Sequence, residues 1–272
     1  MNTQHDQFQD YPIVVEHLIT SYDGRRILDD INLRVRRGEA LVVVGGSGCG
    51  KTTLLRHLIG LLDPEAGHIY IKGKDITHLD EDDLNEIRKQ VGMLFQSAAL
   101  FNSMTLGDNV ALPLREHTRL ANSTIKIMTR IKLGLVGLTG FDNFKPSQLS
   151  GGMKKRAGLA RALAMDPEIL FFDEPSSGLD PIIAAEIDQL IIKLKRAFHM
   201  TMVIVTHEME SAFSIADRIL MLDDGRVIAH GTPDELRDNP NPRVQQFLNR
   251  EPNEEEQDED KYLQLITGDD VL

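Results

Sequence analysis

Short apolar runs alternate with helix-like stretches along most of the chain. Ala40–Val44 and Ile169–Phe172 are apolar throughout, as expected of strands covered on both faces of a parallel sheet, so we place both inside one sheet. Four further β-branched or apolar runs predict strands: Ile13–Thr20, Val91–Phe95, Met202–Val205 and Ile219–Leu222. The alternation predicts an α/β fold with a largely parallel sheet.

The strand pattern lapses between Gln96 and Arg161, where Ser123–Leu133 and Gly151–Ala164 have helical patterns. We therefore predict a helical subdomain at about residues 97–161. The folded body is expected to end near Arg250, which divides the chain into a domain over residues 1–250 and an extension over residues 251–272.

Negative charge is concentrated in that extension. The chain has a formal net charge of −12, of which residues 251–272 contribute −8 through nine acidic residues and Lys261. Residues 1–250 are close to neutral and lack the basic footprint that nucleic-acid binding usually needs. We predict no nucleic-acid partner.

Membrane spans, export and a disulfide scaffold are also unexpected. No apolar run exceeds seven residues, whereas a spanning helix needs roughly 20. Residues 1–12 are polar and lack the features of a signal peptide, and Cys49 is the single cysteine. We expect a chain of the reducing cytosol.

A glycine-rich loop follows the apolar strand Ala40–Val44 and matches the pattern G-x-x-x-x-G-K-[ST]. In such a loop, backbone N–H groups and a helix N-terminus bind phosphates. We predict a helix over residues 51–61, with Lys51 reaching the β- and γ-phosphates and Thr52 ligating Mg²⁺. No redox role is expected for Cys49. The residues assigned to the nucleotide's phosphates are Gly45, Gly46, Ser47, Gly48, Cys49, Gly50, Lys51, Thr52 and Thr53.

Two adjacent acids, Asp173 and Glu174, end the strand Ile169–Phe172. Carboxylates at the C-terminal edge of a parallel strand face the crevice in which such sheets bind ligands. Asp173 would hold Mg²⁺ through water, and Glu174 would polarise the water that attacks the γ-phosphate. An acidic turn would have the same sequence, but next to a phosphate loop the pair predicts a nucleoside triphosphatase.

The run Leu149-Ser150-Gly151-Gly152-Met153 resembles the LSGGQ signature of the ATP-binding cassette (ABC) ATPases, with Met153 in place of glutamine. The motif order of that family extends over nearly the whole body. The resemblance implies a P-loop cassette with a mostly parallel central sheet, an antiparallel β subdomain and a helical subdomain. It also assigns roles to Tyr22 (stacking on adenine), Gln96 (Mg²⁺ or the attacking water), Asp180 (the D-loop, residues 177–180) and His207 (the γ-phosphate and the orientation of Glu174).

The same resemblance implies a homodimer. In ABC ATPases the signature, here Ser150, Gly151 and Gly152, closes over the ATP bound to the opposing subunit. Because this chain holds one complete motif set, two identical copies would form two competent sites. We expect Met153 to leave the backbone anion site intact. Lys154, Lys155, Arg156 and Arg161 follow the signature, and for most of them we expect only a solvated helix face.

A more specific resemblance is to the ATPases of the Mla phospholipid transport systems of Gram-negative bacteria and their MCE-associated relatives. It rests on Met153 and on three segments, Phe95–Phe101, Asp108–Val110 and Pro113–His117. It implies an integral permease (MlaE-like), an MCE-domain protein (MlaD-like) and a STAS-domain protein (MlaB-like) at the inner membrane. ATP hydrolysis on its cytoplasmic face would move phospholipid to or from periplasmic carriers and maintain outer-membrane lipid asymmetry.

Several alternatives stay open at this point. The chain would also suit an importer of polar amino acids or other small solutes, or a soluble ABC ATPase without a transport role; Glu174 disfavours a scaffold that does not hydrolyse ATP. Residues 97–106 either receive the coupling helix of a permease or form a helix that packs within their own subdomain. The acidic extension is either disordered or docks through Tyr262–Ile266 to stabilise the dimer.

Overall fold

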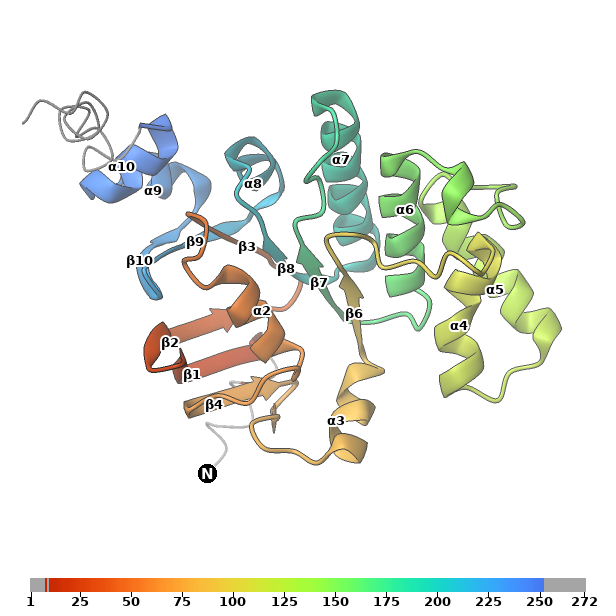
Figure 1. The fold of residues 1–272 in the computed structure, drawn as a ribbon, viewed down its shortest axis with the longest axis horizontal. Helices are drawn as coiled ribbons and strands as arrows, with labels where there is room; N and C mark the ends of the chain where they lie inside the picture. Colours follow the sequence, from red (N-terminus) through yellow and green to blue (C-terminus); the bar gives the residue numbers. More distant parts are fainter. Residues whose placement is uncertain (1–7, 9, 252–272) are drawn as a thin grey trace, which may run out of the picture.

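The computed structural model describes residue 8 and residues 10–251, so the extension beyond residue 251, with its proposed docking segment, lies outside the described residues. Two sheets and a group of helices make up the fold (Figure 1). Within the described part of the chain, no helix combines the length and the apolar character that crossing a membrane requires.

The larger sheet is mostly parallel, as the sequence predicts. Its strand order is β10-β9-β3-β8-β7-β6; β10 is antiparallel to β9, and every other neighbouring pair is parallel. The two all-apolar runs form β3 and β7, which both lie inside the sheet. The strands are β3 (Ala40–Gly45), β6 (Val91–Leu94), β7 (Ile169–Asp173), β8 (Thr201–Val205), β9 (Arg218–Asp223) and β10 (Arg226–Gly231).

The smaller sheet is antiparallel, with the order β2-β1-β4-β5. Alternation of Ile31, Leu33 and Val35 with exposed polar residues along β2 gives that strand one buried face. One hydrophobic cluster joins this face to helix α2 (Lys51–Leu58) and to one face of the larger sheet. The strands are β1 (Ile13–Tyr22), β2 (Arg25–Val35), β4 (Ala66–Ile71) and β5 (Lys74–Asp75).

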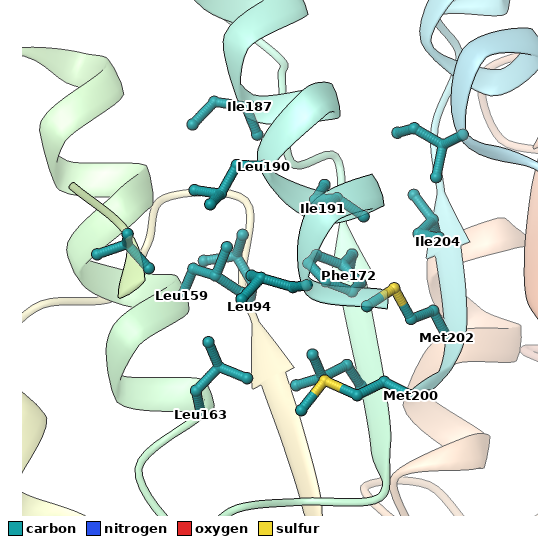
Figure 2. Packing of buried hydrophobic residues seen from close by; sticks show 14 of the residues in the cluster. Leu94, Leu159, Leu163, Phe172, Ile187, Leu190, Ile191, Met200, Met202 and Ile204 are labelled. Carbon is teal, nitrogen blue, oxygen red and sulfur yellow. The ribbon is translucent and has the colours of Figure 1, made fainter. Parts of the chain in front are cut away.

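Helices cover the other face of the larger sheet and continue beyond its β6 edge (Figure 1). Figure 2 shows Leu159 of α6 beside Leu94 of β6, and Ile191 of α7 beside Phe172 of β7, in this second core. The helices are α3 (Glu81–Arg88), α4 (Leu106–His117), α5 (Asn122–Leu135), the short 3₁₀ helix η1 (Pro146–Gln148), α6 (Gly151–Ala162), α7 (Pro181–Phe198), α8 (Met209–Ile215), α9 (Pro233–Arg237) and α10 (Pro242–Asn249).

Helix α2 ends at Leu58, three residues earlier than predicted. Gly60 has a φ of +65°, its N–H donates to the carbonyl of His57, and Leu61 N donates to the carbonyl of Arg56. A left-handed glycine with these bonds closes a helix. Strand β6 ends at Leu94, one residue earlier than predicted.

His57 on α2 is fully buried and its imidazole is bonded on both sides. Nδ1 lies 2.8 Å from the carbonyl oxygen of Leu62, so it carries the proton, and Nε2 lies 2.7 Å from Thr20 Oγ1. Burial lowers the pKa of His57. As pH falls below about 6.5 the unfolded chain therefore takes up a proton before the folded protein does, and the folded state loses stability.

We therefore expect His57 to contribute a loss of unfolding free energy of up to about 1.4 kcal/mol per pH unit below pH about 6.5. Urea unfolding at pH 7.0, 6.0 and 5.0, compared between the wild type and His57→Gln, isolates this contribution because all other groups are shared. The variant should show the flatter pH dependence. Parallel curves would contradict the assignment.

Candidate nucleotide site

The predicted phosphate loop joins β3 to α2 and presents an uncapped helix N-terminus. Gly50 occupies the N-cap position of α2, no side chain caps the helix, and its first turn holds no carboxylate. Gly45 has a φ of +149°, and a Cβ there would lie 2.2 Å from the carbonyl oxygen of Leu222. Only glycine fits at that position. The free N–H groups of the first turn form an anion-binding end.

Lys51 lies inside this loop. Its side chain is buried, and Nζ donates to the carbonyl oxygens of Gly45 and Gly46, at 2.8 Å each. Cys49 is buried beside it, and burial raises the pKa of its thiol. Ser47 and Thr52 are exposed at the same end of α2. The loop thus places the ammonium of Lys51 and the hydroxyls of Ser47 and Thr52 beside the helix N-terminus.

Asp173 ends β7 with a buried oxygen, Oδ1, that accepts no hydrogen bond from the described residues. Burial raises the pKa of Asp173, the nearby Glu174 raises it further, and Arg56, Lys155 and Lys51 oppose both effects. Buried carboxylate oxygens are normally satisfied by partners. An unbonded carboxylate oxygen near a predicted phosphate-binding loop is a suitable ligand for a divalent cation that prefers oxygen.

Glu174 is held by the strand next to it. Its backbone has a φ of +49°, and its N–H donates to the carbonyl oxygen of Val205 at 2.9 Å. Its Oε1 lies 2.9 Å from Nδ1 of His207, and Oε2 accepts from Oγ1 of Thr206 at 3.3 Å. The contact with His207 is predicted above, whereas that with Thr206 is not, because the only signal for Thr206 is its place before that histidine.

Lys155 is a second residue that the sequence analysis misjudges. It is buried, and Nζ donates to the carbonyl oxygen of Glu174 at 2.7 Å. Burial lowers the pKa of Lys155, while the nearby Glu174, Asp173 and Glu208 oppose that shift.

The expectation of a mostly solvated basic face after the signature is therefore wrong. Arg156 donates to the carbonyl of Val136 and pairs with Glu186, and Arg161 donates to the carbonyls of Ala98 and Ala99. These bonds hold Lys155, Arg156 and Arg161 against other parts of the protein, which the basic residues of the sequence alone do not reveal.

The signature forms the N-terminus of α6 and packs on the loop before α7. Ser150 is exposed, and its Oγ accepts from the N–H of Met153 at 3.3 Å, while the Met153 side chain packs on the larger core. Asp180 caps α7 in the same way, accepting from Ile183 N. A Cβ on Gly152 would lie 2.5 Å from Cγ2 of Ile183. Two exposed helix N-termini therefore lie close together.

Replacing Gly152 with alanine is expected to lower the free energy of unfolding by about 1–3 kcal/mol, because the methyl group overpacks this contact. Gly151→Ala is the matched control, since its added Cβ meets only the flexible Leu179 side chain at 3.1 Å. Urea unfolding of Gly152→Ala, Ile183→Ala and the double variant should show a coupling of about 1 kcal/mol or more. Additive effects would mean that the two side chains do not clash.

Tyr22 and Gln96 stand apart from this cluster. Tyr22 ends β1 with 45% of its surface exposed, and Gln96 is exposed just after β6. No side-chain hydrogen bond joins either residue to another predicted site residue over residues 10–251. The structure thus brings together Glu174, His207 and Asp173, and separately the signature and Asp180.

The chain is similar to known ATP-binding proteins of transport systems. Residues 28–177 match the family model described as ABC transporter. The intermembrane phospholipid transport system ATP-binding protein MlaF of Haemophilus influenzae is 46% identical over 239 residues, covering 88% of this chain and 90% of that protein. A probable ribonucleotide transport ATP-binding protein, mkl, of Mycobacterium tuberculosis is 46% identical over 237 residues, covering 87% of this chain and 66% of that protein.

A solved structure shows the same fold with nucleotide. The ATP-binding cassette MJ0796, in a dimeric post-hydrolysis state bound to ADP and Pi, aligns with a TM-score of 0.76 and 33% identity over 81% of this chain and 98% of that one. The family match spans more than half of the chain. The matched residues include the phosphate loop, the acids Asp173 and Glu174, and the signature. The chain belongs to the ABC transporter family and is an ATP-binding subunit that hydrolyses ATP.

Proposed function

We propose that the chain is the ATPase of a phospholipid transport complex, acting as a homodimer on the cytoplasmic face of an inner membrane. Similarity to MlaF over 88% of this chain and 90% of that protein carries the proposal, because it extends well beyond the motifs shared by all ABC ATPases. Hydrolysis would drive phospholipid between the inner membrane and periplasmic carriers and so maintain outer-membrane lipid asymmetry.

The nucleotide would lie across the first turn of α2. Tyr22 offers an exposed ring for adenine, and the backbone of residues 45–53 offers N–H groups to the phosphates. Lys51 Nζ, now bonded to two loop carbonyls, is within the loop and can turn to phosphate oxygens. Ser150, Gly151, Gly152 and Asp180 of the second copy would complete the site from the opposite side.

The residues present suit Mg²⁺. The orphaned Oδ1 of Asp173 and the exposed Thr52 and Gln96 supply the oxygens that this cation prefers. When bound, Mg²⁺ would offset the charge that develops on the phosphate oxygens. The charge on Asp173 would then be balanced.

Glu174 would act as the general base. Its carboxylate holds the attacking water and takes a proton from it as the bond from the water oxygen to the γ-phosphorus forms. The bond from that phosphorus to the β–γ bridging oxygen breaks, which leaves ADP and phosphate. Thr206 and His207, which directly follow β8, hold the carboxylate. His207 is more than half exposed and is therefore accessible to the γ-phosphate.

A groove at the β6 edge supports a permease partner. It has a volume of 470 Å³ and is lined by apolar residues including Phe95, Phe101 and Pro113, together with polar ones: Arg88, Lys89, Glu116, His117 and Arg161. Both phenylalanines are exposed. Asn109 holds the groove's loop, accepting from the N–H of Phe101 at 2.8 Å and donating to its carbonyl at 3.1 Å. Residues 97–105 form no helix; Ala98 and Leu100 pack on the core, whereas Phe101 is exposed.

Affinity capture of the full chain from its native membranes in mild detergent tests the proposal. We expect a permease, an MCE-domain protein, a STAS-domain protein and bound phospholipid. Phe101→Asp should lower permease recovery at least about fivefold, because a charge replaces an apolar anchor, whereas Phe198→Asp, on another exposed phenylalanine, should not. Unchanged recovery with Phe101→Asp would count against the groove as the docking site.

Small-solute import is the second candidate. The similarity to mkl over 87% of this chain favours it, and that protein is described as a probable ribonucleotide transport ATP-binding protein. The same capture separates the two, because an importer would bring a permease with a soluble substrate-binding protein and no MCE-domain protein. Recovery in the soluble fraction alone would favour a non-transport ATPase.

A further inference from the structure

Lys155 connects the helix that carries the signature to the backbone of the proposed base. It lies in the second turn of α6, and its side chain is 6% exposed. Its Nζ donates to the carbonyl oxygen of Glu174 at 2.7 Å. Nothing in the hydrolysis scheme above uses this buried ammonium, although a buried charge is costly and is retained only where it has partners.

The backbone of Glu174 needs such a support. Its φ of +49° lies in the left-handed region, which costs a residue other than glycine about 1 kcal/mol or more and persists only where surrounding structure holds it. Three hydrogen bonds hold the backbone of Glu174. Its N–H donates to the carbonyl of Val205, and its carbonyl accepts from Lys155 Nζ at 2.7 Å and, at the longer distance of 3.3 Å, from the N–H of Ser177. Between them they fix both peptide groups that flank the Glu174 side chain.

The first turn of α6 is fixed as well. A Cβ on Gly151 would meet Leu179 at 3.1 Å, and one on Gly152 would meet Ile183 at 2.5 Å, so this turn packs tightly on the D-loop and on α7. Helix α6 thus carries the exposed signature at its N-terminus. One turn later, its Lys155 donates a hydrogen bond to the carbonyl of Glu174 in the same chain.

We propose that Lys155 is a positioning residue for ATP hydrolysis, whose hydrogen bond to the carbonyl of Glu174 keeps that residue in the conformation that directs its carboxylate to His207. The inference rests on the proposed role of Glu174. Lys155 would thus act on the nucleotide bound by the phosphate loop of its own chain, where Glu174 of that chain is the base. The signature on the same helix would face the other nucleotide, which is bound by the second copy.

Lys155→Met removes Nζ and keeps an unbranched apolar side chain. We expect kcat to fall about 10- to 100-fold, with the KM for ATP and the affinity for a fluorescent ATP analogue changed by less than about twofold. Lys155→Arg should restore kcat to within about threefold of the wild type, because a guanidinium also donates to a carbonyl. Lys154→Met, next to it on the same helix, is the matched control and should retain wild-type kcat.

An unchanged kcat in Lys155→Met would overturn the proposal, as would a failure of Lys155→Arg to restore activity. These assays use the full chain in the complex captured from its membranes. If that wild-type complex fails to hydrolyse ATP, the proposed function itself fails, which is a distinct result from normal wild-type turnover with an unaffected variant.

Mixed dimers, built from two differently tagged copies, decide which site Lys155 serves. With Lys155→Met and Glu174→Gln in one copy and a wild-type partner, turnover should equal that of a dimer carrying Glu174→Gln in one copy only. With the two substitutions in opposite copies, turnover should fall by a further factor of about 10. The reverse pattern would show that Lys155 acts through the signature on the opposite nucleotide, contrary to the proposal.

Discussion

Glu174→Gln is expected to lower ATP turnover by about 10²- to 10⁴-fold while leaving ATP binding intact, the range that loss of a general base produces. Glutamine has nearly the same shape, so the bonds that Thr206 and His207 make to this side chain need only small adjustments. The amide cannot accept the proton of the attacking water. ATP should therefore accumulate on the protein, and the dimer that sandwiches it should persist.

Steady-state phosphate release and binding of a fluorescent ATP analogue measure the two halves of this expectation. Glu210→Gln is the matched control, because Glu210 is exposed on α8 and makes no ion pair among the described residues. It should hydrolyse ATP like the wild type. If Glu174→Gln retains turnover within about threefold of the wild type, another group is the base.

Asp173→Asn is expected to have two effects of opposite sign. Without nucleotide, it should raise the free energy of unfolding at pH 7 by about 1 kcal/mol, because it removes a buried charge whose Oδ1 has no partner among the described residues. With MgATP, turnover should fall by about 10²-fold or more, since the amide is a poor substitute for a carboxylate in neutralising the cation.

The sign of the stability effect follows from the pKa. Burial, and then Glu174, raise the pKa of Asp173 in the folded protein. A carboxyl with a raised pKa stabilises the fold at low pH and loses that contribution as pH rises through its folded pKa. At pH 7 the charged form is therefore unfavourable, and a neutral side chain relieves it.

Asp188→Asn provides the control for this prediction. Asp188 on α7 is also buried with an unpartnered Oδ1, and burial raises its pKa, but it lies outside the proposed site. It should show the gain in stability without the loss of turnover. Thermal unfolding with and without MgATP, together with phosphate release, distinguishes the two variants; equal activity in both would contradict the assignment of Asp173 to Mg²⁺.

The sequence predicts those parts of the fold and site that depend on neighbouring residues. The all-apolar runs around Val42 and Phe171 indicate interior strands, and the G-x-x-x-x-G-K-[ST] spacing needs no distant contact to be recognised. The sequence also carries a signal for β2, because Ile31, Leu33 and Val35 alternate with polar residues. The charged residues at the start of this strand, such as Arg25, weaken that signal, and β2 is not among the strands predicted above.

Contacts between distant segments account for the rest. Lys155 and Glu174 are 19 residues apart, and Thr206 lies 32 residues after Glu174, so only the packing of α6 and β8 around β7 shows that these groups meet. The left-handed backbone of Glu174 has no sequence signal either, since glutamate rarely adopts it. Burial of Lys155 contradicts its local context, a run of basic residues that is typical of an exposed helix face.

Transfer of labelled phospholipid tests the central claim most directly. The complex captured with this chain would be reconstituted in vesicles, and exchange of a labelled phospholipid with the proposed MCE-domain partner would be measured with MgATP. We predict transfer that depends on ATP, is lost with Glu174→Gln and is unaffected by Glu210→Gln. Normal ATP hydrolysis without any ATP-dependent movement of phospholipid, or transfer that Glu174→Gln leaves unchanged, would contradict the proposal that this ATPase drives phospholipid transport.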